Sequence, residues 1–238
     1  MKLYELDSLL SKYEKKLGEL EKIALNQKIE ESIEAYPFNS YELRLTYLLD
    51  KEILDYKEYE RIRKDYISSN KYLELYGLAP RIFGQVWGEE HILSVDTRFQ
   101  KASKSLDVNY CNEYDLWLNG IKIEVKASHA SDKKIRGNPI SKALHIESDR
   151  SFWMNFQQIK FNVCDYFIFI GVWVDNIKYW VLSENEVKTH PNLSHQHRGG
   201  VEYQIGITDK NIDIFNKFLK NSKEIADYII RDFNENQS

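Results

Sequence analysis

The sequence predicts an α/β fold in which helices flank a central mixed sheet, preceded by an N-terminal helical region. Three observations predict it: helical spacing of apolar residues over 3–78, an Asn119-Gly120 turn between two alternating runs, and a continuous apolar run at 166–174. Helical and strand patterns mixed along one chain are typical of a sheet covered by helices. The 238 residues, 42% hydrophobic and 29% charged, suit one globular domain or one domain with a helical annex.

The first predicted element is a long amphipathic helix. Apolar residues recur there at spacings of 4, 3, 4, 3 and 4, at Leu6, Leu10, Tyr13, Leu17, Leu20 and Ala24. Such a stripe packs against a second helix, for which residues 41–67 are the candidate, after a break at Pro37 and Asn39. An intramolecular helical hairpin and a dimer seam both remain open. Gly77 to Pro80 marks a boundary, so the expected domains are 1–78 and 79–238.

The second region is expected to alternate between helices and strands. Residues 81–95 predict a helix with Ile82, Val86 and Leu93 on its apolar side, and 129–150 predict a polar loop. Residues 151–162 predict a helix that Ser151 caps. The run at 166–174 suits a central strand covered on both faces, 177–182 a strand paired with it, and 209–234 a closing helix.

The hairpin at 115–126 has a register that follows from its turn. Asn-Gly is the strongest short-range hairpin signal, because both central residues of a type I′ turn need positive φ. The expected pairs are Leu118 with Ile121, Trp117 with Lys122, Leu116 with Ile123, and Asp115 with Glu124. Side chains alternate between faces, which predicts an apolar face of Leu116, Leu118, Ile121, Ile123 and Val125.

The opposite face of this hairpin brings two acids together. Directly opposed residues hold their Cβ atoms roughly 5 Å apart, and like charges there destabilise a sheet. A cation would relieve the repulsion between Asp115 and Glu124, and Mg²⁺ suits hard oxygen ligands that leave room for water. Lys126 lies two residues further along the same face. These groups suit phosphodiester hydrolysis with a metal-activated water; the alternative is an exposed charged face in which Lys126 is a salt-bridge partner.

At these residues the chain resembles the PD-(D/E)xK nuclease superfamily, and within it the type II restriction endonucleases. Asp115 matches the first acid, and Glu124-Val125-Lys126 matches the acid-x-Lys motif; Tyr114 stands where the family often has proline. The resemblance covers roughly residues 80–182. It implies a restriction-endonuclease-like fold and a Mg²⁺ site formed by Asp115, Glu124 and Val125, with Lys126 as the catalytic lysine.

The resemblance also points to residues outside the motif. Relatives often carry an acid on the preceding helix, for which Glu89 is the first choice and Glu90 the alternate. Many place a Gln or Lys on a helix after the second strand, where Gln157, Gln158 and Lys160 are candidates.

Two loops supply candidate DNA contacts. The first carries a basic cluster and the second three histidines and an arginine; the candidates are Lys133, Lys134, Arg136, Lys142, His195, His197 and Arg198. For both loops a plain solvated loop is the alternative, and three histidines without a nearby cysteine argue against zinc.

The sequence therefore predicts a Mg²⁺-dependent endonuclease that cuts double-stranded DNA at a short specific sequence as a homodimer, with the N-terminal helices serving dimerisation or recognition. The alternatives are a structure-specific repair or recombination nuclease of the same fold, and an inactive DNA-binding module. The net charge of −4 argues against a protein that coats phosphates non-specifically. A charged N-terminus without a leader pattern, no apolar run of membrane length, and Cys111 and Cys164 as reduced core thiols predict a cytoplasmic protein without a membrane partner.

Overall fold

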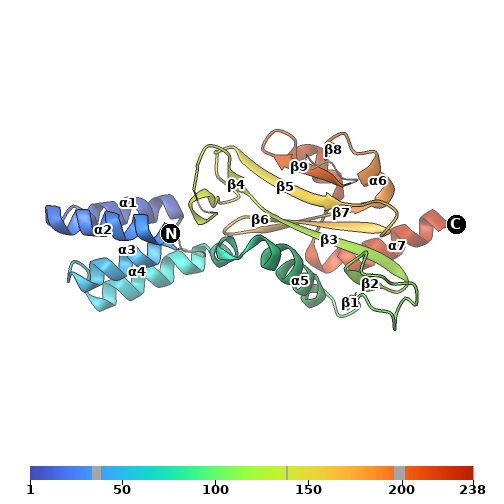
Figure 1. Ribbon diagram of the computed structural model, residues 1–238, viewed down its shortest axis with the longest axis horizontal. Coiled ribbons are helices and arrows are strands. Elements are labelled where there is room, and N and C mark those ends of the chain that lie inside the picture. Colours follow the sequence, from blue (N-terminus) through green and yellow to red (C-terminus); the bar gives the residue numbers. More distant parts are fainter. Residues whose placement is uncertain (34–38, 138, 196–201, 238) are drawn as a thin grey trace. The chain divides into compact units, whose positions relative to one another are not determined.

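The computed structural model describes residues 1–33, 39–137, 139–195 and 202–237, which form two compact units. The first unit contains Met1–Ala79, Asp132–Arg150 and Trp173–Asn176, and the second contains Pro80–Ser131, Ser151–Val172 and Ile177–Ser238. The predicted fold class is confirmed, because a mixed sheet with flanking helices follows a set of N-terminal helices (Figure 1). The expected division at residue 79 describes the order along the chain, whereas in space two later segments join the first unit.

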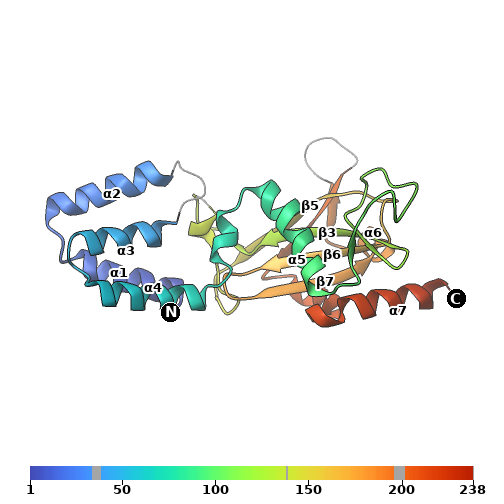
Figure 2. The same ribbon diagram turned by 90° about the horizontal axis from the view of Figure 1, so that it is seen from below.

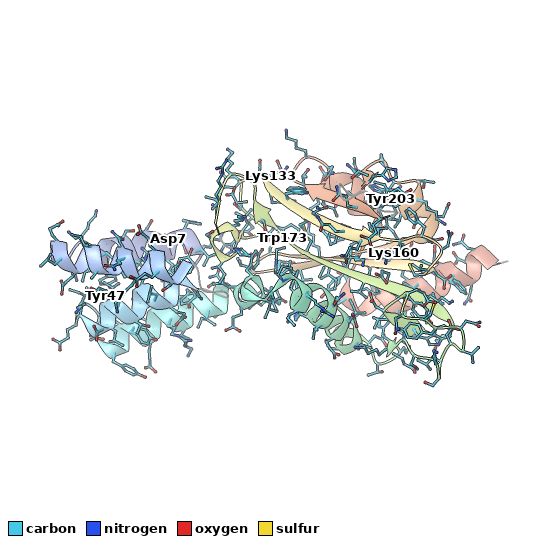
Figure 3. The ribbon with its side chains drawn as sticks, in the orientation of Figure 1. Asp7, Tyr47, Lys133, Lys160, Trp173 and Tyr203 are labelled. Atoms are coloured by element: carbon cyan, nitrogen blue, oxygen red, sulfur yellow. The ribbon has the colours of Figure 1, made fainter. Side chains whose placement is uncertain are left out.

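Four helices form most of the first unit (Figure 2): α1 (Leu3–Glu14), α2 (Glu19–Ile33), α3 (Ser40–Asp50) and α4 (Tyr56–Ser69). A short 3₁₀ helix, η1 (Leu73–Gly77), follows them. Asn39 caps α3 by accepting the Tyr41 N–H, as a residue at a helix start does. Buried leucines from three of the helices make the core between them, and the Tyr47 hydroxyl donates to the Glu21 carbonyl (Figure 3).

The predicted long first helix is wrong. The chain leaves the helix after Glu14 and resumes at Glu19, so the apolar stripe is divided between α1 and α2. Gly18 lies in the break, and glycine costs a helix interior about 1 kcal/mol relative to alanine. Leu6, Leu10 and Leu17 are buried as expected, but Leu20 is 82% exposed. The expected pair of long helices is therefore a set of shorter ones.

Two segments from later in the chain complete the first unit. The Tyr72 N–H donates to the Val174 carbonyl at 2.9 Å, and the Val174 N–H donates to the Leu144 carbonyl at 3.0 Å. His145 is buried and accepts the N–H of Leu3 at the start of α1. The predicted polar loop at 129–150 is thus partly ordered, with η3 (Ile140–Lys142) inside it.

A six-stranded mixed sheet is the centre of the second unit. Its order is β1 (Gln100–Lys101), β2 (Leu116–Leu118), β3 (Ile121–His129), β6 (Tyr166–Val172), β7 (Ile177–Ser183) and β10 (Leu219–Lys220). β3 and β6 are parallel and the remaining pairs are antiparallel. Every residue of β6 is buried, which confirms the predicted central strand and its β7 partner.

A second, four-stranded sheet lies over the first (Figure 1), in the order β4 (Ser131–Asp132), β5 (Phe152–Ile159), β9 (Tyr203–Thr208) and β8 (Leu193–His195). Met154 and Phe156 of β5 face the first sheet, where the Phe156 ring is 5.0 Å from that of Phe169. Gly171 permits this close approach, because a Cβ there would lie 2.8 Å from the Met154 Sδ.

The helix predicted at 151–162 is wrong, since β5 occupies that segment. Buried Met154 and Phe156 alternate with exposed Trp153 and half-buried Asn155, which is the period of a strand. A β-bulge between Phe156 and Ile159 then shifts the phase. Because of that shift, the apolar spacing of 2 and then 3 resembles a helical pattern in the sequence alone.

The helix before the hairpin has the expected extent but a different buried side. It begins as a π-helix, η2 (Ile82–Trp87), and continues as α5 (Gly88–Val95). Ile82 and Val86, which were expected to face the core, are 46% and 52% exposed. Phe83 and Ile92 are buried instead, because π-helical turns change the phase of the side chains.

The closing segment contains less helix than predicted. It divides into η4 (Ile212–Phe218), β10, η5 (Ser222–Glu224) and α7 (Ile225–Gln237), while α6 (Glu184–Lys188) is an additional short helix. Cys164 is a buried free thiol as expected, whereas Cys111 is free but exposed. In the described part of the chain, no helix combines the length and apolar character that a membrane crossing needs.

Candidate active site

The predicted turn and register of the hairpin are confirmed up to the end of β2. Asn119 and Gly120 have φ of 50° and 94°, and Leu116, Trp117 and Leu118 pair with Ile123, Lys122 and Ile121. The expected apolar face is buried at all five positions. The fourth expected pair lies outside the ladder, because Asp115 precedes β2 and its N–H donates to the Ile123 carbonyl at 3.0 Å.

Although Asp115 and Glu124 are not ladder partners, their carboxyl groups are hydrogen-bonded to each other. The Asp115 carboxylate also accepts the Val125 N–H at 2.8 Å. Asp115 therefore lies beside β3 where β2 has ended, next to the backbone of the acid-x-Lys segment. In a strand, the N–H and C=O of one residue point to the same side, so the Val125 carbonyl is directed to the side of β3 on which Asp115 lies.

Lys126 completes this cluster from the same face of β3 as Glu124. Its Nζ is 2.6 Å from the Glu124 Oε1, and the two side chains are only 18% and 13% exposed. Water therefore screens this ion pair less than it would a pair on the open surface. Lys126 contacts the acid pair directly and does not extend into solvent.

The two acids are held in an environment that disfavours their charged forms. Burial raises the pKa of Glu124 to about 7, with the Asp115 charge adding to the rise and Lys126 opposing it. Burial also raises the pKa of Asp115, against the hydrogen bond from Val125 and the charge of Lys126. The pair therefore holds a proton more tightly than isolated carboxyl groups do, and its titration belongs to both residues together.

Glu89 approaches the pair from α5. Its side chain is 14% exposed, and its pKa is raised by burial and by the charge of Asp115. Glu90, the alternate in the sequence, is exposed. The structure thus separates two neighbours that the helical pattern could not, and it is Glu89 that lies near the hairpin acids.

Lys101 belongs to the same cluster and was not found from the sequence. Its Nζ is 3.5 Å from the Glu89 Oε2, and its side chain is 67% exposed. Its charge lowers the pKa of both Glu89 and Asp115 against the effect of burial. Lys101 reaches the site because β1 pairs with β2 through Lys101 and Leu116. A strand of two residues carries no sequence pattern, so no local signal could have identified it.

Tyr110 is a second residue that sequence reasoning missed. Burial and the charges of surrounding acids, with Asp115 the first of them, raise the pKa of its hydroxyl. Its ring meets that of Tyr114 edge-on at 5.0 Å. The hydroxyl therefore stays protonated beside the acids and can donate a hydrogen bond.

The donor set suits Mg²⁺ that is only partly surrounded by protein. Asp115 and Glu124 supply hard carboxylate oxygens, and Mg²⁺ commonly takes one or two carboxylates and completes its shell with water and phosphate. Within residues 1–33, 39–137, 139–195 and 202–237, no group of three or more His, Cys, Asp or Glu residues is arranged to hold a metal ion. The fit is therefore to a two-carboxylate site in which Glu124 exchanges its Lys126 partner for the ion.

The other predicted contacts lie elsewhere in the fold. Lys133, Lys134 and Arg136 are exposed and Lys142 is half-buried, all within the 132–150 segment of the first unit. Gln157, Gln158 and Lys160 do not lie on a helix: Gln157 and Gln158 are on β5 and Lys160 follows it (Figure 3).

The histidine loop is described only in part. His195 is exposed on β8, with its ring 4.5 Å from that of Tyr203. His197 and Arg198 lie outside the described residues.

Comparison with known proteins adds no family to this geometry. A scan against protein-family models finds no match, and no curated protein matches the chain. What the site can do is therefore inferred from its own chemistry: a proton-sharing acid pair, a paired lysine, a third acid and an exposed second lysine.

Proposed function

We propose that the chain is a Mg²⁺-dependent endonuclease that cuts double-stranded DNA at a short specific sequence. The observation that carries the proposal is the grouping of Asp115, Glu124 and Lys126 within direct hydrogen-bond and ion-pair contact at one half-buried corner of the hairpin. Strongly perturbed carboxyl groups held together in this way are typical of catalytic sites.

A purely structural role explains this cluster less well. Two acids in mutual contact and largely out of water destabilise the fold unless something compensates them. Lys126 offsets part of that cost for Glu124, yet the pKa of Glu124 remains raised to about 7. A binding partner that brings positive charge would complete the compensation, which is why we infer a divalent cation.

Each residue then has a role. Asp115, Glu124 and the Val125 carbonyl would hold the ion. When bound, Mg²⁺ lowers the pKa of a coordinated water and neutralises charge on a phosphate. Lys126, displaced from Glu124, would hydrogen-bond the attacking water and stabilise the charge that develops on the phosphate. Glu89, whose pKa is raised, is suited to accept a proton from the water network beside Asp115.

Cleavage of both strands of a duplex requires two such sites, so we propose that the active form is a homodimer. Each copy would cut one strand of a two-fold symmetric sequence, as closed two-fold symmetry favours.

The proposal is tested by incubating the full-length protein with unmodified plasmid and Mg²⁺. The expected result is a small set of discrete fragments. Lys126→Ala should reduce the cleavage rate at least about 100-fold while DNA binding in Ca²⁺ persists. Lys122→Ala is the matched control, since Lys122 lies on the same face of β3 but pairs with Asp107, and it should retain cleavage.

Other results would change the proposal. A smear in place of fragments would indicate a nuclease without sequence preference, and cleavage confined to branched substrates would indicate a structure-specific enzyme. DNA binding with no cleavage would indicate an inactive binding module. Equal cleavage by wild type and Lys126→Ala would remove the assigned chemistry.

A further inference from the structure

The outward face of the second sheet carries a row of uncharged polar side chains that the catalytic cluster does not use. In β5 the inward residues are Met154 and Phe156, so Trp153, Asn155 and Gln157 take the outward positions. Asn155 pairs with Gly206 of β9, and the neighbouring outward residue of β9 is Gln204. Ser194 of β8 pairs with Gln204 and shares its face.

An amide pair is fixed in the middle of this face. The Asn155 Nδ2 donates to the Gln204 Oε1 at 3.1 Å. That hydrogen bond orients both amides and leaves the Asn155 Oδ1 as an acceptor and the Gln204 Nε2 as a donor. Side by side on two paired strands, an acceptor and a donor form the pattern that an adenine edge requires, because its N6 donates and its N7 accepts.

An exposed indole lies next to the amides. Trp153 is 50% exposed, and a Cβ on residue 206 would lie 3.2 Å from its Nε1. Gly206 therefore allows the indole to lie against the sheet, as a large apolar surface held in one orientation. Such a surface suits the C5-methyl group of thymine, which is the apolar feature of the major groove.

This face is joined to the catalytic strand. Glu124, Lys126 and Ser128 lie on one face of β3, and the Ser128 Oγ accepts the backbone N–H of Asn155 at 2.9 Å. Two residues of strand separate Lys126 from Ser128, about 7 Å at about 3.4 Å each. That length matches the rise of about two base pairs. A duplex with its scissile phosphate at Lys126 would thus bring base edges near the amides.

We propose that Trp153, Asn155, Gln157 and Gln204 read base edges in the major groove of duplex DNA, and that the amide pair selects an A·T base pair. This inference rests on the proposed nuclease function. Sheet strands are known to read the major groove, and uncharged amides discriminate bases where lysines would bind phosphate. His195 is not part of this surface, because it pairs with Tyr203, two residues from Gln204's neighbour Ile205 on the inward side.

The test is sequencing of the DNA ends that the full-length protein produces from plasmid with Mg²⁺. Wild-type ends should share a sequence that includes an A·T pair. Gln204→Glu keeps the shape of the side chain but replaces the amide donor by an acceptor, so the preference for that pair should fall about 5- to 150-fold. Asn155→Ala should relax the same position. Asn216→Ala, an exposed asparagine of η4, is the matched control and should leave the sequence of the ends unchanged.

The outcomes separate this inference from the function on which it rests. No cleavage by wild type would overturn the nuclease proposal itself. Cleavage by wild type with identical end sequences from Gln204→Glu and Asn155→Ala would overturn the readout surface alone, as would a wild-type recognition sequence made only of G·C pairs. Gln204→Glu is isosteric, and its circular dichroism spectrum should match wild type, so a changed end sequence reports recognition and not misfolding.

Discussion

Two half-buried charge clusters, one in each unit, differ in how their charges balance. In the first unit, Arg44 is 13% exposed and contacts Glu14 at 2.6 Å and Asp7 at 2.7 Å. Burial lowers the pKa of its guanidinium, but the hydrogen bonds to these acids more than reverse that effect. Around the hairpin, three acids gather, Glu124 has its lysine, and the pKa of all three is raised. The first cluster is complete within the protein, whereas the second is short of positive charge.

The largest effect on stability that follows concerns Glu124. Its folded-state pKa of about 7 lies above the ordinary 4.5, so the folded protein binds the extra proton and becomes less stable as pH rises through this interval. At about 1.4 kcal/mol per pKa unit, the loss approaches about 3 kcal/mol by pH 8. We expect Glu124→Gln, measured by urea unfolding in EDTA, to be matched with wild type near pH 5 and more stable at pH 8.

Added Mg²⁺ sharpens the same measurement. Since the ion competes with the proton, it should stabilise wild type more at pH 8 than at pH 6 and leave Glu124→Gln nearly unaffected. A wild type whose stability relative to Glu124→Gln does not change between pH 5 and pH 8 would contradict the raised pKa.

The balanced cluster should respond in the opposite sense. Arg44→Ala leaves Glu14 and Asp7 without their cation, and loss of one partner of a buried pair costs about 3 kcal/mol. The denaturant midpoint should therefore fall at pH 7, with recovery at low pH where the two acids are neutral. Arg63→Ala is the control: its pair with Glu42 is 46% and 32% exposed, and such pairs contribute less than about 1 kcal/mol. Equal losses in the two variants would remove the distinction.

The smallest expected effect is that of Lys101 on DNA binding. If the shortage of positive charge is met partly by Lys101, its exposed ammonium can leave Glu89 for a phosphate once Mg²⁺ or Ca²⁺ is bound. Lys101→Ala should then lower the slope of log Kd against log salt by about 0.9, measured in Ca²⁺ to prevent cleavage. Lys104→Ala, an exposed lysine three residues away, should have the wild-type slope.

The parts that could be predicted from the sequence are those with local causes. Asn119-Gly120 determines its own turn, and the period of the flanking residues determines which side chains are buried. The continuous run at β6 predicts a strand covered on both faces. Glu124 and Lys126 therefore could be placed on one face of one strand before any coordinates.

The parts that failed depend on distant contacts or on changes of phase. The bulge after Phe156 imitates helical spacing, and the π-helical start of the helix before the hairpin rotates its apolar side away from Ile82 and Val86. Lys101 enters the site through a strand pair of two residues. Glu89 could be separated from Glu90 only by the packing of α5, in which Gly88 lies against Val125 and Ala127.

The two-residue turn also has a consequence for how this chain can vary. Chemistry and core alternate along β3, so every side chain there depends on counting from Asn119-Gly120. One inserted residue that shifted the pairing would turn Glu124 and Lys126 inward and push Ile123 and Val125 into water. Substitution can adjust the acids singly, but a change in chain length at this point would remove the active site and the hydrophobic core in a single event.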